Sequence, residues 1–358
     1  MKMREISVEQ LLQLKDAVPV DVRSPGEYEE FSIPGAVNIP LFTNEERALI
    51  GTIYKQEGTD TAKWRAMEIV SPKLPSLLGQ IRALHDEGKH PVIYCWRGGM
   101  RSKSVATFLS FSGISVPRLI GGYRAYRQYI LDEIPNLIPP TAISIHGMTG
   151  VGKTEVLEKL KDCGMPVIDL EACAGHRGSI FGTFGLFEGH NQKTFDSLLY
   201  QTLLNIKDSP FFLVEAESKR IGKAVQPDEL LERKHRGLNI NLQASLSSRI
   251  ERIYRDYVAP YLQEQWFHDK VLERLTILYK RIKNQDVIAR LNDEARRQNY
   301  KAVIQILLED YYDPRYAHKQ LDYQGEFYHI EADNADDAVE EILTFLQSKS
   351  AFILHGEV

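Results

Sequence analysis

Two series of short apolar runs, separated by stretches of helical spacing, divide this chain. In the first series, residues 19–23 and 90–95 are β-branched runs that end in turn or loop signals, which predicts two strands. Residues 8–17 and 74–88 carry apolar positions at helical spacing, and the charged stretch 44–70 is typical of a helical insertion. Strands that alternate with helices favour a parallel sheet covered by helices on both faces.

The second series follows residue 141. Its apolar runs predict strands at 142–147, 166–172, 210–218, 239–245 and the start of 326–347. Helices are expected from Lys153, from Leu246, across most of 260–310 and at the end of 326–347. Between the series, 131–142 holds three prolines and is typical of a linker. We therefore expect α/β domains at 1–131 and 142–350, a linker at 132–141, and a helical segment at 246–310.

Composition limits the class of protein. The 358 residues carry a net charge of −5 and are 43% hydrophobic, which suits a soluble globular chain of two domains. The N-terminal residues are charged, and no run approaches the roughly 18 apolar residues of a membrane helix. We therefore expect neither a signal peptide nor a membrane span. Three cysteines without pairing spacing predict a reducing, cytoplasmic setting and no disulfide framework.

Charge is distributed unevenly along the chain. Between Glu232 and Lys301 there are 15 Lys and Arg residues against 9 Asp and Glu residues, although the whole chain is acidic. A basic segment in an acidic protein indicates a polyanionic partner. Solvated helices joined by ion pairs would give the same composition, and both interpretations stay open.

A phosphate-binding loop is predicted between the strand 142–147 and the following helix. The stretch GMTGVGKT satisfies the pattern G-x-x-x-x-G-K-[ST] in the strand–loop–helix context that its mechanism requires. Its glycines let backbone N–H groups converge on phosphate oxygens beside a helix N-terminus. The residues expected to bind phosphate here are Gly147, Thr149, Gly150, Val151, Gly152, Lys153 and Thr154.

Acidic residues follow two strands of the same series. Asp169 and Glu171 lie at the end of one predicted strand, and Glu215 and Glu217 lie at the end of the next, where parallel sheets bind their ligands. Thr154 and Glu215 are therefore the candidate ligands for a magnesium ion, although an exposed strand-end carboxylate is the simpler alternative.

A glycine-rich stretch at 173–195 mixes cations with aromatic residues and is either a lid or a packed irregular loop. As a lid it would offer Arg177 to phosphate, and Phe181, Phe184 and Phe187 to an apolar tail or a base.

A second anion cradle is predicted where the strand 90–95 ends in Cys95. Arg97 and Arg101 follow the cysteine, and a helix is expected directly after the loop. A thiol near arginines and a helix N-terminus is favoured as a thiolate and becomes nucleophilic. The alternative is a buried structural cysteine, but unpaired arginines are rarely found in a dry core.

The N-terminal region resembles the rhodanese family. The stretch DVRSPGEYEEFSIPGAVNIP at 21–40 is similar to the family's first signature, and RLIGGYRAYRQYI at 118–130 is similar to its closing signature. The resemblance implies a cysteine that carries transferable sulfur or selenium. Sulfur-transferring members usually have Cys-x₄-Arg, whereas five residues separate Cys95 from Arg101. The longer loop also occurs in dual-specificity phosphatases, so phosphatase chemistry stays open.

The fusion of the two halves resembles the bacterial tRNA 2-selenouridine synthases. The stretches GMTGVGKTEVL, HRGSIFG and EGHNQKTFDSLL carry this resemblance, which covers nearly the full chain. It implies a rhodanese-like parallel-sheet domain followed by a P-loop NTPase-like α/β domain with a helical insertion. It also implies a transferase that geranylates a wobble 2-thiouridine of tRNA from geranyl diphosphate and then exchanges the sulfur for selenium from selenophosphate.

Site residues follow from this resemblance together with the motifs above. Catalytic roles fall to Cys95, Arg97, Arg101 and Lys153, and the expected selenium-carrier loop comprises Cys95, Trp96, Arg97, Gly98, Gly99, Met100 and Arg101. The residues expected to bind tRNA are Arg249, Arg252, Tyr254, Arg255, Lys280, Arg281 and Lys283. We expect no tightly bound cofactor and a monomer. Mg²⁺ is a candidate ligand, and an enzyme that supplies selenophosphate is a candidate partner.

Two other functions fit the same motifs. One is a bifunctional enzyme with an ATP-dependent kinase half and a sulfurtransferase or phosphatase half. The other is a non-catalytic RNA-binding or regulatory protein, against which the presence of Cys95, Lys153 and Thr154 argues.

Overall fold

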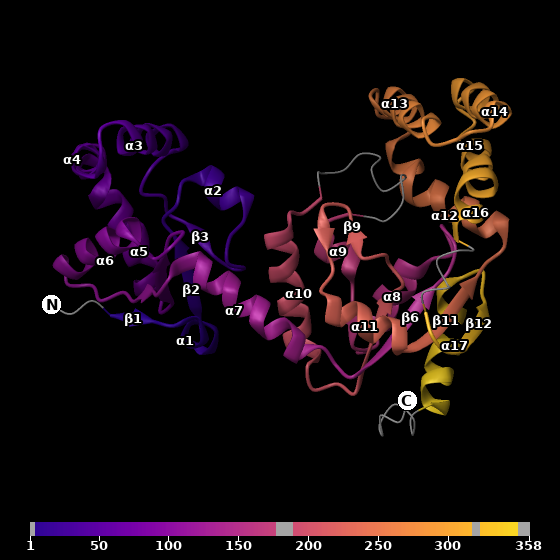
Figure 1. Cartoon of the computed structure of the whole chain (residues 1–358), viewed down its shortest axis with the longest axis horizontal. Helices are drawn as coiled ribbons and strands as arrows, with labels where there is room; N and C mark the ends of the chain where they lie inside the picture. The colour runs from indigo at the N-terminus through magenta and orange to yellow at the C-terminus, as the bar shows by residue number, and fades with distance from the viewer. Residues whose placement is uncertain (1–3, 177–188, 317–322, 350–358) are drawn as a thin grey trace. The chain divides into compact units, whose positions relative to one another are not determined.

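The computed structural model describes residues 4–176, 189–316 and 323–349 (Figure 1). The chain divides into two compact units, one comprising residues 1–133 with 196–198 and the other the remaining residues. Each unit contains its own five-stranded parallel sheet, so the chain has the α/β fold that the alternating pattern predicts.

The sheet of the first unit has the strand order β1-β5-β4-β2-β3. Its strands are β1 (Glu5–Ile6), β2 (Ala17–Asp21), β3 (Val37–Asn38), β4 (His90–Tyr94) and β5 (Arg118–Leu119). Its helices are α1 (Val8–Gln13), α2 (Pro25–Glu30), α3 (Asn44–Gln56), α4 (Thr59–Val70), α5 (Leu74–Asp86), α6 (Met100–Phe111) and α7 (Gly122–Leu137). One core cluster joins the central strands to α5 and α6, and Cys95 belongs to it.

The sheet of the second unit has the strand order β12-β11-β6-β8-β7. Its strands are β6 (Thr141–His146), β7 (Val167–Ile168), β8 (Phe211–Glu215), β11 (Leu238–Gln243) and β12 (Phe327–Glu331). The helices α8 (Lys153–Asp162) and α17 (Ala335–Ser348) pack together over one core cluster, and α11 (Asp228–Arg236) lies against β6. The short helix α9 (Leu170–Ala174), the helix α10 (Gln192–Ile206) and the two-stranded ribbon β9 (Arg220–Ile221) and β10 (Ala224–Val225) complete this part.

The helical insertion between β11 and β12 has a hydrophobic core of its own. It comprises α12 (Leu246–Tyr257), α13 (Phe267–Tyr279), α14 (Gln285–Arg296), α15 (Tyr300–Leu307), a π-helical turn (Leu308–Tyr312) and α16 (Asp313–Tyr316). Apolar residues at helical spacing on α13, α14 and α15 are buried together, which explains why the sequence pattern predicted helices here.

Two expected boundaries differ from the structure. The expected linker 132–141 is helical as far as Leu137, because α7 continues through Pro135 instead of ending before it. The expected strand 166–172 ends at Ile168, since the Asp169 carboxylate accepts a hydrogen bond from the Ala172 N–H at 2.8 Å and caps α9. Among the described residues, no helix is long and apolar enough to cross a membrane.

Candidate functional site

The phosphate loop joins β6 to the N-terminus of α8. Gly147 and Gly150 have φ angles of 148° and 83°, a region that L-residues rarely adopt. A Cβ atom on Gly147 would lie 2.7 Å from the Leu242 carbonyl oxygen, and one on Gly150 would lie 2.8 Å from Cδ1 of Ile253. Glycine is therefore required at both positions by backbone conformation and by close packing.

Lys153 begins α8 and extends back along the loop. Its Nζ donates a hydrogen bond to the Gly147 carbonyl oxygen at 2.9 Å. The ammonium group therefore lies over the loop, beside the helix N-terminus, where a phosphate would bind.

Two arginines of α12 hold the phosphate loop from outside. Nε of Arg249 donates to the Thr149 carbonyl oxygen at 2.9 Å, and Nη1 of Arg252 donates to the Gly150 carbonyl oxygen at 2.6 Å. The Arg249 guanidinium also forms a two-pronged ion pair with Asp313, at 3.0 and 2.6 Å. Both carbonyl oxygens therefore point away from a bound phosphate, and no pattern in the sequence predicted these contacts.

Three carboxylates gather beside Thr154. The Thr154 hydroxyl donates to Glu215 at 3.0 Å and lies 3.5 Å from Glu171. Carboxylate oxygens of Glu171, Glu215 and Glu217 lie within 4.8 Å of one another. Burial, reinforced by the negative charge of Glu171, raises the pKa of Glu215 to about 8.

These groups fit a magnesium ion. Mg²⁺ prefers hard oxygen ligands, and a hydroxyl with nearby carboxylates supplies them next to the phosphate loop. A bound cation would also relieve the repulsion among the three acids. Thr154 and Glu215 are the two ligands that the sequence predicted, and in the structure Glu171 and Glu217 lie beside them.

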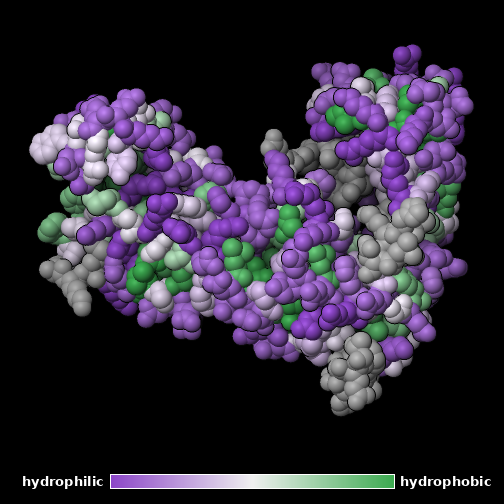
Figure 2. Space-filling view, viewed as in Figure 1, coloured by the Kyte–Doolittle hydropathy of each residue, from purple (hydrophilic) through white to green (hydrophobic). Residues whose placement is uncertain are grey.

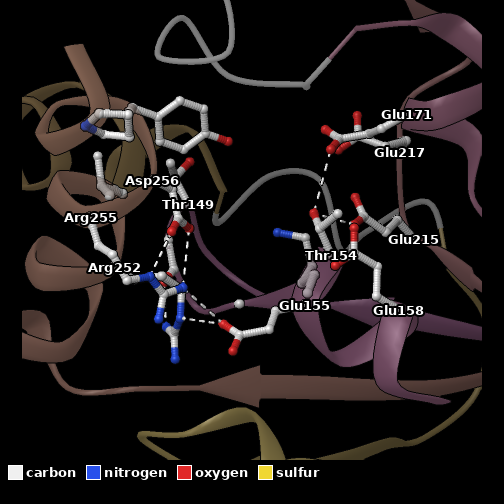
Figure 3. Close-up of a pocket in the computed structure, with 16 residues that line it drawn as sticks. Thr149, Thr154, Glu155, Glu158, Glu171, Glu215, Glu217, Arg252, Arg255 and Asp256 are labelled. Atoms are coloured by element: carbon white, nitrogen blue, oxygen red, sulfur yellow. Dashed lines mark hydrogen bonds and ion pairs between the residues drawn. The ribbon is translucent and has the colours of Figure 1, made fainter. Parts of the chain in front are cut away.

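A cavity of about 430 Å³ opens over the phosphate loop. In Figure 3, Glu171, Glu215 and Glu217 lie with Thr154 on one side of it, and Arg252 and Arg255 lie across from them. Glu155 pairs with both arginines, at 3.5 and 3.2 Å. The cavity can thus hold a polyanion between backbone amides, a cation bound to the carboxylates, and the arginines of α12.

Not every predicted phosphate ligand faces this cavity. The Val151 side chain packs into the core of the unit, so this residue would contribute only its backbone groups. Thr149 lines the cavity, although little of it is exposed. Arg177 and the three phenylalanines of the expected lid lie outside the described residues. Their predicted roles stay predictions.

The cysteine loop joins β4 to α6. Cys95 is only 3% exposed, and its Sγ lies 3.3 Å from Oγ of Ser102. The same hydroxyl donates to the Gly99 carbonyl oxygen at 3.2 Å, so Ser102 links Cys95 to the backbone of the loop. Gly98 adopts φ 60°, and a Cβ atom there would lie 2.9 Å from the Leu119 carbonyl oxygen. The loop is packed tightly, and Cys95 belongs to the core cluster instead of lying open.

The two arginines of this loop behave differently. Arg101 forms a two-pronged pair with Glu27, at 2.5 and 3.1 Å, whereas Arg97 is exposed. Burial opposes ionisation of Glu27, but the hydrogen bond and charge of Arg101 outweigh it and lower its pKa. Arg101 is therefore engaged by a carboxylate, so an anion at Cys95 would have to compete for it.

The remaining residues of this loop divide between packing and exposure. Trp96 stacks on Tyr123 with 5.7 Å between ring centroids, while Met100 is 60% exposed. Cys163 is exposed, and burial raises the pKa of Cys173 to about 11, so Cys173 is a neutral thiol at neutral pH.

The residues expected to contact tRNA occupy two different places. Lys280, Arg281 and Lys283 are exposed at the turn between α13 and α14. The face of the insertion that Figure 2 shows is largely hydrophilic. Arg255 is also exposed, while Tyr254 packs partly against the insertion core. By contrast, Arg249 and Arg252 are turned to the phosphate loop.

Ion pairs account for part of the basic segment. Lys301 pairs with Glu251 at 2.5 Å, and Arg290 pairs with Asp310 at 3.2 Å. Some basic residues of this segment are thus exposed and could bind a polyanion, while others form ion pairs on the surface of the helices.

Comparison with known proteins points to one family for both halves. The family model described as the tRNA 2-selenouridine synthase AAA domain matches residues 140–350, and the model of the rhodanese-like domain matches residues 7–129. A tRNA 2-selenouridine synthase of Pseudomonas syringae pv. syringae is 32% identical over 366 residues, covering 95% of this chain and 96% of that protein. One of Bdellovibrio bacteriovorus is 32% identical over 357 residues, covering 88% and 93%. The chain therefore belongs to the tRNA 2-selenouridine synthase family.

Proposed function

We propose that this protein is a cytoplasmic transferase that modifies the wobble 2-thiouridine of tRNA in two steps. The first step places a geranyl group from geranyl diphosphate on the thiocarbonyl sulfur. The second replaces that sulfur with selenium from selenophosphate. The proposal rests on one observation above all: a single chain carries an open phosphate loop faced by carboxylates and, in its other half, a strand-end cysteine loop.

The first step is assigned to the half bounded by residues 142–350. The thiocarbonyl sulfur bonds to C1 of geranyl diphosphate, the C1–O bond breaks, and diphosphate leaves with the electron pair while the base loses its N3 proton. Lys153 and the loop amides would stabilise the charge that develops on the diphosphate. A magnesium ion, held by Thr154 and Glu215 with support from Glu171 and Glu217, would supply further neutralisation.

The second step is assigned to residues 1–131, where Cys95 would be the residue that carries the selenium. Thiolate is a poor leaving group from the base, and alkylation removes its charge, so geranylthiol departs more easily. The C2–S bond breaks, a C2–Se bond forms, and water takes the phosphoryl group of selenophosphate. The net exchange is redox-neutral. Arg97 is exposed and would attract the selenium-bearing anion, whereas Arg101 would contribute only after leaving Glu27.

The exposed basic turn of the insertion is proposed to bind tRNA. Lys280, Arg281 and Lys283 can each neutralise a phosphate, so tRNA affinity should fall steeply as salt concentration rises. A triple alanine variant should lower the steepness of that dependence. An unchanged salt dependence would move the tRNA site away from this turn.

The test is nucleoside analysis by mass spectrometry. Cells without the gene should lack 2-selenouridine in tRNA. The purified protein should form S-geranyl-2-thiouridine from geranyl diphosphate when selenophosphate is withheld, and chelation of Mg²⁺ should slow that step. Consumption of ATP stimulated by an acceptor, without any geranylated product, would favour a kinase instead.

A further inference from the structure

A second cavity, of about 490 Å³, lies on the other side of the phosphate loop. It is formed where β6 and β11 end, and its lining includes the first residues of the loop, Gly147 and Met148. Its size falls within the range of roughly 300–1,000 Å³ typical of small-molecule sites.

This cavity adjoins the phosphate-binding cavity. Lys153 and Glu217 line both of them, so a ligand whose phosphates lie over the loop can extend its remaining part into the second cavity. The two cavities therefore belong to one bipartite site.

The polar side chains around the second cavity already bond to other protein groups. His146 bonds to Asn239 at 3.0 Å, and its burial lowers its pKa to about 4, so it is neutral near pH 7. Arg249 is paired with Asp313. The amide groups of Asn241 and Gln243 both lie against His329, at 3.3 and 3.4 Å.

Apolar groups make up much of the remaining lining. These are Ile145, Met148, Val151, Ala216, Leu242 and Ala244. Met148 is 42% exposed although it belongs to the phosphate loop, where an apolar side chain contributes nothing to phosphate binding. The wall of the cavity thus offers mainly hydrophobic contact, because the polar side chains named above are already hydrogen-bonded within the protein.

We propose that the second cavity receives the apolar isoprenoid chain of a prenyl diphosphate whose diphosphate lies on the phosphate loop. This inference rests on the proposed function, because that function supplies the prenyl diphosphate. The second cavity can hold the isoprenoid chain without any contribution from the phenylalanines of the expected lid. A nucleobase would need hydrogen-bonding groups that here are paired with one another.

The experiment measures two dissociation constants by calorimetry, one for geranyl diphosphate and one for inorganic pyrophosphate. Pyrophosphate binds only to the phosphate loop, so the ratio of the two dissociation constants measures how much the isoprenoid chain adds to binding. The wild-type protein should bind geranyl diphosphate about 100-fold more tightly than pyrophosphate, since burying several methylene-sized groups is worth that much.

Variants that fill the cavity should remove this preference. Ala244→Phe and Ala216→Phe place a ring in the space that the chain would take, and Met148→Ala removes a wall contact without adding bulk. The first two should bring the ratio close to one, and the third should lower it about fivefold, while pyrophosphate binding stays the same. Ala289→Phe, at an exposed position of α14, is the matched control and should keep the full ratio.

Each result decides the matter. If the wild type prefers geranyl diphosphate and the cavity variants keep that preference, the chain binds elsewhere and this inference is overturned while the proposed function stands. If the wild type binds both ligands equally, the proposed function fails as well. If ATP binds more tightly than tripolyphosphate and Ala244→Phe abolishes that difference, the cavity is a nucleobase site. Should both phenylalanine variants fail to fold, the Met148→Ala ratio decides.

Discussion

The phosphate loop and the cysteine loop each connect the end of a central parallel strand to a helix N-terminus, β6 to α8 in one case and β4 to α6 in the other. The phosphate loop lies open under a cavity, and arginines from α12 bond to its carbonyl oxygens from behind. The cysteine loop is closed, because Cys95 is buried and Arg101 is bonded to Glu27.

This difference follows from which groups the arginines near each loop bind. In the phosphate loop, arginines from another element fix the backbone, so the amides stay available for a ligand. In the cysteine loop, one of the two arginines, Arg101, is neutralised by the neighbouring carboxylate of Glu27. We infer that the phosphate loop already has its ligand-binding conformation before a ligand binds. In the cysteine loop, Arg101 must leave Glu27 before it can bind an anion.

The largest expected effect separates the two loops completely. Cys95→Ala should abolish selenium incorporation and leave S-geranylation largely intact, because the phosphate loop lies in the other unit. Mass spectrometry of tRNA nucleosides measures both products. Normal 2-selenouridine in this variant would show that Cys95 does not handle selenium.

The reciprocal change tests the phosphate loop. Lys153→Ala should slow geranylation by about 100-fold or more, since it removes a cation placed where diphosphate charge develops. The variant should still convert tRNA that was geranylated beforehand. Loss of that conversion as well would mean that the two steps are not separable in this way.

A smaller effect is expected from the loop supports. Arg252→Ala removes the bond to the Gly150 carbonyl oxygen and should weaken pyrophosphate binding about tenfold, the value of one charged hydrogen bond. Arg290→Ala removes only a surface pair with Asp310 and serves as the control. Equal pyrophosphate affinities in the two variants would contradict a role for Arg252 in organising the loop.

The smallest effect concerns the closed loop. Glu27→Gln keeps the side-chain length but loses the charge that engages Arg101, so phosphate or selenophosphate binding at the cysteine loop should strengthen about twofold to fivefold. Because the folded pKa of Glu27 is lowered, its pair stabilises the protein above the usual carboxyl pKa and is lost as pH falls through the lowered value. The variant should therefore lose less stability on acidification, which denaturant unfolding at several pH values can measure.

Much of the fold could be predicted from the sequence, because the relevant signals are local. The alternation of apolar runs and helical spacing predicted all five strands of the second sheet. Four of these strands, β6, β7, β8 and β11, are almost wholly buried, whereas the edge strand β12 buries only Ile330. The pattern missed α10, α11 and the β9–β10 ribbon. The loop expected at 173–195 overlaps the start of α10, and strands of two residues, such as β9 and β10, are too short to show a periodic pattern.

The candidate site shows the same division. The sequence by itself determined that Cys95 lies where a strand gives way to a loop and that a glycine loop precedes Lys153, because strand, loop and helix are neighbours along the chain. Only the tertiary structure decided that Arg249 and Arg252 support the phosphate loop, that Glu27 engages Arg101, and that a second cavity adjoins the first. These contacts join residues 74 to 102 positions apart, and their partners depend on how buried faces pack, which no local pattern records.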